Sequence, residues 1–234
     1  MAIYYLKESK IEKDQIIITN DLLHHLKNVL RIKKGEKIKF FDDNFIYTTE
    51  CIEKEKDALI FRIKEISKNK KPEIEFNIIQ SVIEKSELED SIRLLVTSRV
   101  SKIFVTNTER SAKSFKETNL KRLREIALNT SEQSEICFIP EIIYLESLDR
   151  AIQMFHENSF VLHFGSKYSL KDIPSIANLN KPITFFVGPE GGFSEGEIEM
   201  FKKNAIPIIT LKSGVFRSQF AGTVAVLVTL ELIS

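Results

Sequence analysis

The residues best suited to chemistry are the glycines that interrupt the chain between positions 188 and 192. An apolar segment, 183–187, is predicted to be a strand, and it ends abruptly in Gly-Pro-Glu-Gly-Gly. Glycines at the carboxyl end of a strand let main-chain groups approach a ligand closely, because no Cβ intervenes. Ser194 then opens a predicted helix, and Glu197 follows three residues later, as in a capping box. The pattern favours a ligand-binding loop over a structural turn, which needs only one glycine.

This loop differs from two familiar nucleotide-binding loops. No Gly-Lys-Ser/Thr follows it, as a mononucleotide phosphate loop requires, and its spacing is not the Gly-x-Gly-x-x-Gly of dinucleotide sites. An adenosine group held by main-chain atoms is compatible with the pattern.

A second segment that could do chemistry, 211–219, follows the next predicted strand along the chain. We expect the two strand ends to be neighbours in one parallel sheet, so that both loops lie at the same sheet edge. Arg217 stands where a helix is expected to begin, and the helix dipole disfavours a cation there. Arg217 therefore suggests anion binding or the orientation of a base; the alternative is a surface arginine paired with a carboxylate.

An α/β framework is needed to position these segments, and the hydrophobic pattern of residues 71–234 predicts one. Apolar strands alternate with helices, which is typical of a mainly parallel sheet with helices on both faces. The expected strands are 76–79, 103–106, 160–164, 183–187 and 206–211, and the expected helices are 84–96, 119–128, 194–204 and 220–232.

Residues 1–70 follow a different pattern, in which short strands surround one helix that starts near residue 20. Many short strands with a single helix predict a small β-barrel. A polar linker that ends in Pro72 separates this segment from the α/β part. The expected strands are 16–18, 37–41, 45–51 and 58–66.

Charge is divided unevenly between the two parts. The whole chain has a formal net charge of +1, but residues 1–71 carry 16 Lys and Arg against 12 Asp and Glu, a net +4. The rest carries 18 against 21, a net −3. A basic small domain beside a slightly acidic larger one suits a protein that holds an anionic polymer with one part and does chemistry with the other. A lysine-rich solvated surface is the alternative interpretation.

Several classes of protein are not expected from this sequence. Cys51 and Cys137 are isolated, with neither metal-ligand spacing nor a disulfide framework, so no metal is expected. The N-terminal residues show no signal-peptide pattern, and no apolar run approaches the roughly 20 residues of a membrane span. We therefore expect a cytoplasmic protein with no membrane partner.

The two C-terminal segments together carry a specific resemblance to a known family. Gly-Pro-Glu-Gly-Gly-Phe-Ser at 188–194, followed by Leu-x4-Phe-Arg-Ser from Leu211, resembles the ribosomal RNA small-subunit methyltransferase E family of the SPOUT superfamily. His-His-Leu-Lys-Asn-Val-Leu-Arg at 24–31 is similar to the PUA-like barrel of that family. Segments 108–111 and 131–134 are also similar to family segments, so the resemblance covers most of the chain.

This resemblance implies a C-terminal SPOUT-type α/β domain (71–234) with a parallel sheet and a deep trefoil knot, plus a small N-terminal PUA-like β-barrel (1–70). It also implies a homodimer, S-adenosylmethionine as cofactor, and methylation of N3 of a uridine in 16S rRNA of the small ribosomal subunit. Arg217 would face the target base. The residues implied to bind the cofactor are His163, Phe164, Gly165, Val187, Gly188, Glu190, Gly191, Gly192, Leu211, Val215, Phe216 and Ser218.

Methylation of a ring N–H requires a proton acceptor, and the sequence leaves its identity open. Glu190 and His163 are the candidates, because the amide of Gln219 is not a base at neutral pH. Cations that could contact RNA phosphates lie elsewhere in the chain. They are Arg31, Lys33, Lys34 and Arg110.

The chain departs from the family pattern at three places. Arg-Ser-Gln-Phe-Ala at 217–221 replaces Arg-Thr-Glu-Thr-Ala, residues 94–99 replace Lys-x-x-Glu-Leu-Gly, and Ile136 stands where the family has Arg. These parts, which are expected to touch RNA, are more altered than the cofactor loop. Two alternatives therefore stay open: methylation of another RNA, and a non-catalytic RNA-binding or ribosome-assembly role that retains the cofactor fold.

Overall fold

A computed structural model describes residues 2–7, 10–19, 21–112, 115–212, 214 and 216–233. The chain divides into two compact units, each with its own sheet and hydrophobic core. One unit comprises Met1–Lys71 with Ser131–Phe138, and the other comprises Pro72–Thr130 with Ile139–Ser234. The sequence pattern did not indicate that residues 131–138 group with the first unit.

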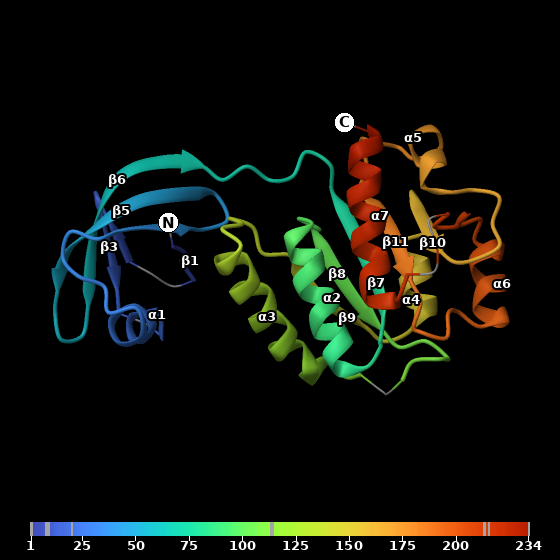
Figure 1. Cartoon of the computed structure of the whole chain (residues 1–234), viewed down its shortest axis with the longest axis horizontal. Helices are drawn as coiled ribbons and strands as arrows, with labels where there is room; N and C mark the ends of the chain where they lie inside the picture. Colours follow the sequence, from blue (N-terminus) through green and yellow to red (C-terminus); the bar gives the residue numbers. More distant parts are fainter. Residues whose placement is uncertain are drawn as a thin grey trace. The chain divides into compact units, whose positions relative to one another are not determined.

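The first unit is a curled six-stranded sheet with the order β1-β4-β5-β6-β3-β2 (Figure 1). Neighbouring strands are antiparallel, apart from the parallel pair of β1 and β4. The expected helix is split, because the N–H of Leu30 bonds to the carbonyl of His25 five residues earlier and continues α1 as a π-helical turn. The elements are β1 (Ile3–Tyr5), β2 (Lys10–Glu12), β3 (Gln15–Ile18), α1 (Asp21–His24), η1 (His25–Val29), β4 (Lys37–Phe41), β5 (Phe45–Lys54) and β6 (Leu59–Lys68).

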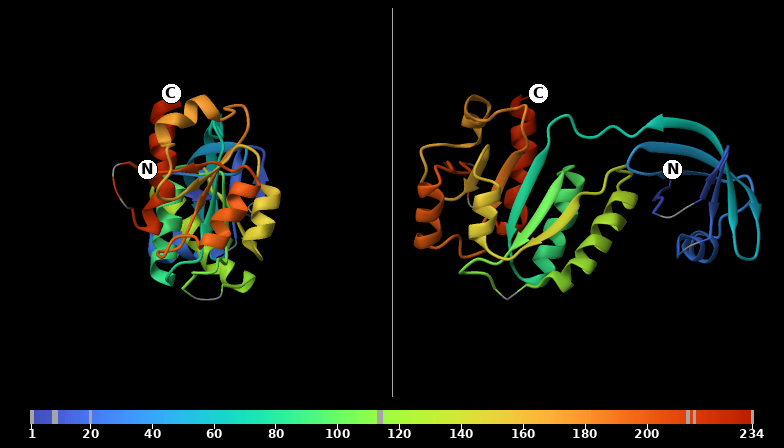
Figure 2. Two further views of the ribbon diagram at one scale, coloured as in Figure 1. Left: turned by 90° about the vertical axis from the view of Figure 1, so that its right-hand side faces the viewer. Right: turned by 180° about the vertical axis from the view of Figure 1, so that it is seen from behind.

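The second unit is built on a fully parallel six-stranded sheet with the order β12-β10-β11-β7-β8-β9. Helix α7 runs alongside the strands in every view (Figures 1 and 2). The elements are β7 (Phe76–Ser81), α2 (Lys85–Thr97), β8 (Lys102–Thr106), η2 (Glu117–Asn119), α3 (Leu120–Gln133), β9 (Glu141–Leu145), α4 (Leu148–Met154), β10 (Ser159–Leu162), η3 (Leu170–Asp172), α5 (Ile173–Ile176), β11 (Ile183–Val187), α6 (Glu195–Lys203), β12 (Ile208–Ile209) and α7 (Ser218–Ile233).

Both faces of the parallel sheet are buried. Successive residues of a strand point to opposite sides of the sheet, and the residues of each side pack into a hydrophobic core. Ile78 and Phe185 join the core that contains α2, α3 and α7. Ile79 and Phe186, the next residue on each strand, join the core that contains α4 and α6. The near-continuous apolar strands in the sequence follow from this double burial.

The alternating α/β pattern expected from the sequence is confirmed, although several boundaries differ. The strand expected at 160–164 ends at Leu162, and the strand expected at 206–211 is reduced to Ile208–Ile209. Helix α7 starts at Ser218, two residues earlier than expected. The sequence reading missed β9, α4 and α5, which are short. Over the described part of the chain, no helix has both the length and the apolar character that a bilayer crossing requires.

Candidate functional site

The carboxyl edge of the parallel sheet positions the site, because the strand register aligns the last residues of neighbouring strands. Leu162 of β10 pairs with Val187 of β11 and with Ile209 of β12, and Val187 pairs with Gln80 of β7. The loops that follow these strands therefore begin at one level. The expectation that the strands ending near Val187 and Leu211 are neighbours is wrong, because β10 lies between β11 and β12. The loop after β10 thus enters the site between the other two.

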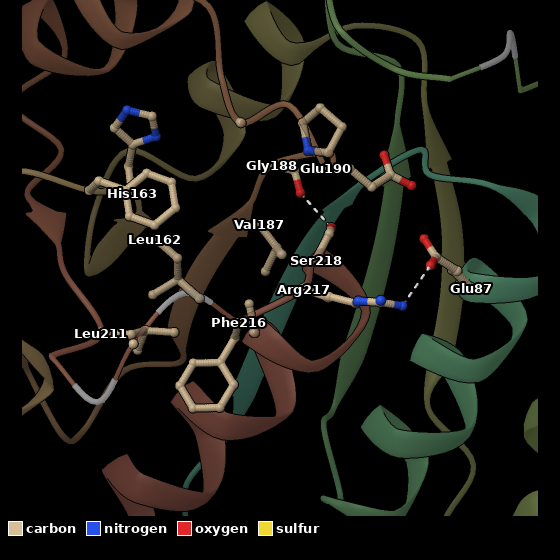
Figure 3. Close-up of a pocket in the computed structure, with 15 residues that line it drawn as sticks. Glu87, Leu162, His163, Val187, Gly188, Glu190, Leu211, Phe216, Arg217 and Ser218 are labelled. Carbon is tan, nitrogen blue, oxygen red and sulfur yellow. Dashed lines mark hydrogen bonds and ion pairs between the residues drawn. The ribbon is translucent and has the colours of Figure 1, made fainter.

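The three loops enclose a cavity of about 470 Å³ (Figure 3). This volume lies in the range of about 300–1,000 Å³ that small-molecule sites occupy. Apolar side chains and glycine-loop main chain form most of its wall, and polar side chains lie toward its ends. The lining residues are Glu87, Leu162, His163, Phe164, Val187, Gly188, Pro189, Glu190, Gly192, Leu211, Gly214, Phe216, Arg217, Ser218 and Ala221.

The glycine loop is held in a conformation that requires glycine at one position. Gly192 has a φ of +67°, and a Cβ at this residue would lie 3.5 Å from Cε1 of His163. The capping box predicted from the sequence is confirmed: the N–H of Ser194 donates to Glu197 at 2.8 Å, and the N–H of Glu197 donates to Ser194 Oγ at 3.1 Å. The buried Glu197 carboxylate also accepts the N–H of Glu109 at 2.9 Å. It therefore joins the loop after β8 to the glycine loop.

Arg110 supports the outer side of the glycine loop. Its Nη1 donates to the carbonyl of Gly191 at 2.8 Å and to that of Phe193 at 3.4 Å. Burial, followed by the nearby charge of Arg110, lowers the pKa of His163. The imidazole at this end of the cavity is therefore mainly uncharged at neutral pH.

Ser218 connects the first residue of α7 to the glycine loop. Its Oγ donates to the carbonyl of Gly188 and accepts a hydrogen bond from Nε2 of Gln80 at 3.0 Å. Gln80 is fully buried, and its Oε1 accepts a hydrogen bond from Ser91 Oγ at 3.3 Å. A chain of buried hydrogen bonds thus runs from α2 through β7 and α7 to the loop, and it fixes the direction of the Gly188 carbonyl.

The loop after β10 is fixed by a side chain that follows β12. Thr210 Oγ1 donates to the carbonyl of His163 at 2.9 Å and accepts the N–H of Ser166 at 2.9 Å. Phe164 remains 58% exposed although it lines the cavity. The loop therefore holds an accessible aromatic ring beside a half-buried imidazole.

The other end of the cavity is charged. Glu87 Oε1 lies 3.9 Å from Nη1 of Arg217, and Glu190 Oε1 accepts the N–H of Glu84 at 3.2 Å. The carboxyls of Glu87 and Glu190 face each other beside Arg217, whereas His163 lies at the opposite end (Figure 3). A hydrogen bond with Glu190, burial and the charge of Glu190 raise the pKa of Glu87. This end can hold or accept a proton.

Metal-assisted chemistry would need a cluster of ligating side chains. Among the residues that the structure describes, no three His, Cys, Asp or Glu side chains are grouped so that they could hold a metal ion. The described groups of the cavity are suited instead to an apolar ring system, to main-chain hydrogen bonding and to proton transfer at the charged end.

Comparison with known proteins places the chain in a family. Residues 69–230 match the family model of an RNA methyltransferase domain, and residues 18–64 match that of an RNA methyltransferase PUA domain. The chain is 30% identical to ribosomal RNA small subunit methyltransferase E of Helicobacter pylori (strain J99), over 80% of this chain and 82% of that protein. The chain belongs to the ribosomal RNA small subunit methyltransferase E family.

Two further members of this family are similar over most of their length. Ribosomal RNA small subunit methyltransferase E 2 of Borreliella burgdorferi is 27% identical over 88% of this chain and 87% of that protein. The crystal structure of the Neisseria gonorrhoeae methyltransferase E, bound to S-adenosyl methionine, shares the fold with a TM-score of 0.87. The two chains are 23% identical, and the match covers 99% of this chain and 98% of that one.

The structure of this methyltransferase E family member brings most of the predicted site residues to one cavity. Gly165 and Gly191 are not among its lining residues, and the Gly191 carbonyl accepts a hydrogen bond from Arg110. Val215 lies outside the described residues. The predicted residues that line the cavity are His163, Phe164, Val187, Gly188, Glu190, Gly192, Leu211, Phe216, Arg217 and Ser218.

The four cations predicted to contact RNA lie in different surroundings. Arg31, Lys33 and Lys34 are exposed on the first unit, after the π-helical turn. Arg110 lies in the second unit and donates to the glycine loop, so it has a supporting role there whether or not it also contacts RNA.

Sequence reasoning missed two residues of the methyltransferase site. Glu87 lies in the first turn of α2, and Gln80 is the last but one residue of β7. Gln80 gave a usable signal, because a polar side chain at the end of an apolar strand needs a buried partner. The sequence around Glu87 gave no such signal, because an acidic residue in the first turn of a helix is common on structural grounds alone.

Proposed function

We propose that this protein is an S-adenosylmethionine-dependent methyltransferase of small-subunit ribosomal RNA, and that it methylates N3 of a uridine. The observation that carries the proposal is the cavity enclosed by the glycine loop, the loop after β10 and the segment that begins α7. The named relatives are ribosomal RNA small subunit methyltransferases, and one solved relative of the same fold holds S-adenosyl methionine.

The lining of the cavity fits this cofactor. Leu162, Leu211 and Phe216 offer an apolar surface for an adenine ring, and the main chain around Gly188 and Gly192 offers hydrogen-bonding groups for the ribose and amino-acid parts. S-adenosylmethionine supplies a methyl group on a sulfonium, which is already an activated leaving group. The protein therefore has to bind and orient both reactants, exclude water and manage one proton.

Arg217 is the residue that we assign to the target base. Its side chain is 76% exposed at the charged end of the cavity, where it can reach a base carried by RNA. Removal of the N3 proton leaves negative charge on the uracil ring and its oxygens. A guanidinium beside that ring stabilises the charge as it develops.

Calorimetry and methyl transfer test these assignments together. We expect S-adenosylmethionine to bind with a micromolar or lower Kd, and labelled methyl groups to appear at one uridine of small-subunit rRNA, located by nucleotide-resolved mass spectrometry. Arg217→Ala should keep cofactor affinity and lose about 10²-fold or more in transfer. Binding of RNA without any methylation would favour the non-catalytic assembly role, and methylation of a different RNA would change the substrate.

The same proposal includes a homodimer. The exposed side of α7 carries an apolar stripe beside a single acidic residue, Glu231, with Phe220, Leu227, Val228 and Leu232 each 39–48% exposed. A polyanionic RNA gains nothing from such a stripe, whereas two copies related by a two-fold axis can bury it against itself. Sedimentation should give a dimer that Leu227→Glu dissociates, and a native protein that stays monomeric at high concentration would exclude this interface.

Three remaining expectations belong to the proposal as well. RNA contacts at Arg31, Lys33 and Lys34 would give the first unit the role of holding rRNA, with strongly salt-dependent affinity. The second expectation is that the α/β domain contains the trefoil knot of the SPOUT fold. The third is a cytoplasmic location, because ribosomal RNA is found there.

A further inference from the structure

The charged end of the cavity holds more than the arginine assigned to the target base. Glu87 comes from the first turn of α2 and Glu190 comes from the glycine loop, so two elements far apart in the sequence bring two carboxyls together. Both residues line the cavity, and Arg217 stands beside them (Figure 3). Arg217 is assigned to the target nucleobase, so that nucleobase binds at this end of the cavity. The group that removes its ring proton must therefore lie at this end as well.

The two carboxyls are not equivalent. Glu190 is fixed by the N–H of Glu84, which donates to its Oε1 at 3.2 Å. Glu87 keeps a longer contact of 3.9 Å with Arg217, and its side chain is 27% exposed toward the cavity. To accept a proton from a substrate, Glu87 has to exchange its contacts with Glu190 and Arg217 for the bound base, while the N–H of Glu84 holds Glu190 in place.

We propose that Glu87 is the catalytic residue that accepts the ring N–H proton of the target base, with Glu190 as the group that positions it. This inference rests on the proposed function. The N–H bond breaks, its proton goes to a carboxylate oxygen of Glu87, and its electron pair stays on the ring nitrogen. That nitrogen forms the new bond to the methyl carbon, and the electrons of the broken carbon–sulfur bond stay on sulfur. Charge and atoms therefore balance without a further reactant.

The surroundings of Glu87 make it a better base than a solvated glutamate. Its pKa is raised, first by the hydrogen bond with Glu190, then by burial and by the charges of Glu190 and Glu84, while Arg217 acts in the opposite direction. A protonated Glu87 must lose its proton before it can accept another. Because the pKa of Glu87 is raised, the transfer rate should rise with pH through that raised pKa.

Two other side chains, His163 and Gln219, are less well suited to accept the proton of the target base. His163 is mainly uncharged at neutral pH and could accept a proton, but it lies at the opposite end of the cavity from Arg217 (Figure 3). Gln219 does not line the cavity, and its amide is not a base.

Single-turnover methyl transfer at saturating cofactor and RNA tests the proposal in the full-length protein. Glu87→Gln should slow transfer by about 10²–10⁴-fold at neutral pH, the usual contribution of a general base. The loss should shrink at high pH, because solvent then removes the proton. Cofactor affinity should change by less than about twofold. Asp90→Asn, which removes an exposed carboxylate on the same helix outside the cavity, should transfer at the native rate.

A second measurement does not depend on turnover. In the free protein, a ¹³C titration of the glutamate carboxyls should show the Glu87 pKa falling in Glu190→Gln, because an amide cannot share the proton or repel the charge. Native transfer by Glu87→Gln at every pH, or a loss that is the same at every pH, would overturn the proposal for Glu87 alone. A native protein that neither binds S-adenosylmethionine nor methylates RNA would instead overturn the proposed function.

Discussion

Replacement of Ser218 by alanine tests whether the hydrogen-bond chain behind the glycine loop sets its geometry. Ser218 is 6% exposed, and its hydroxyl donates to the Gly188 carbonyl and accepts a hydrogen bond from Gln80. Alanine removes only the oxygen, so the helix start and the apolar packing of α7 should survive. The Gly188 carbonyl, however, loses the donor that fixes its direction at the cavity wall.

The loss of stability in Ser218→Ala depends on which hydrogen bonds Gln80 and Gly188 keep. Gln80 Nε2 still donates to the Ser81 carbonyl at 3.0 Å, so only part of its hydrogen bonding is lost. A typical buried hydrogen bond contributes about 1 kcal/mol, and an unpaired buried group costs about 1–3 kcal/mol. We expect the free energy of unfolding to fall by about 2 kcal/mol, which lowers Tm by about 4–8 °C in a chain of this size. If about 1 kcal/mol of loop ordering must be restored on binding, the cofactor Kd rises about fivefold.

Urea denaturation and calorimetry with S-adenosylmethionine measure the two effects. Ser175→Ala is the matched control, because its hydroxyl donates to the Asp172 carbonyl at 2.7 Å on an exposed turn, and we expect a change within about 0.5 kcal/mol. Ser218→Thr keeps the hydroxyl and should retain most of the affinity. If Ser218→Ala matched Ser175→Ala in both stability and Kd, the chain from Gln80 to Gly188 would not set the site geometry.

Three further outcomes are expected. Gly192→Ala forces a Cβ into the left-handed region at about 1–2 kcal/mol, so calorimetry should show a cofactor Kd raised about tenfold. Glu197→Ala removes the acceptor of two backbone N–H groups, one buried and one partly buried, and should cost about 2–3 kcal/mol in urea denaturation; a loss below about 0.5 kcal/mol would contradict this. Burial and the charge of Arg110 lower the pKa of His163, so the unfolded chain binds its proton more readily. Stability should therefore fall as pH drops below about 6.5, and less so in His163→Gln.

The local part of the site could be predicted from sequence, because it depends on neighbours along the chain. The glycine loop, the capping box of Ser194 and Glu197, and the placement of Arg217 just before a helix all follow from residue types within a few positions. The α/β pattern was predictable for the same reason, since a buried parallel strand is apolar along its length. Gly165 and Gly191 were assigned by position in a motif, and neither is among the residues that line the cavity.

The composition of the cavity depended on pairings between distant segments. Insertion of β10 between β11 and β12 brought His163 and Phe164 between two loops that the sequence suggested were adjacent. Register between β7 and β11 placed α2 so that Glu87 faces Glu190, about a hundred positions away along the chain. Nothing in the local sequence around Glu87 indicates this encounter.

Propensity, capping and glycine freedom act over a few residues, so the sequence alone was enough to predict the longer strands and helices, the glycine loop and the family resemblance. The strand order and the contact of Glu87 with Glu190 and Arg217 emerged only from the folded chain. Strand order is set by the burial of two sheet faces and by long-range backbone pairing, and many strand arrangements share the same local pattern.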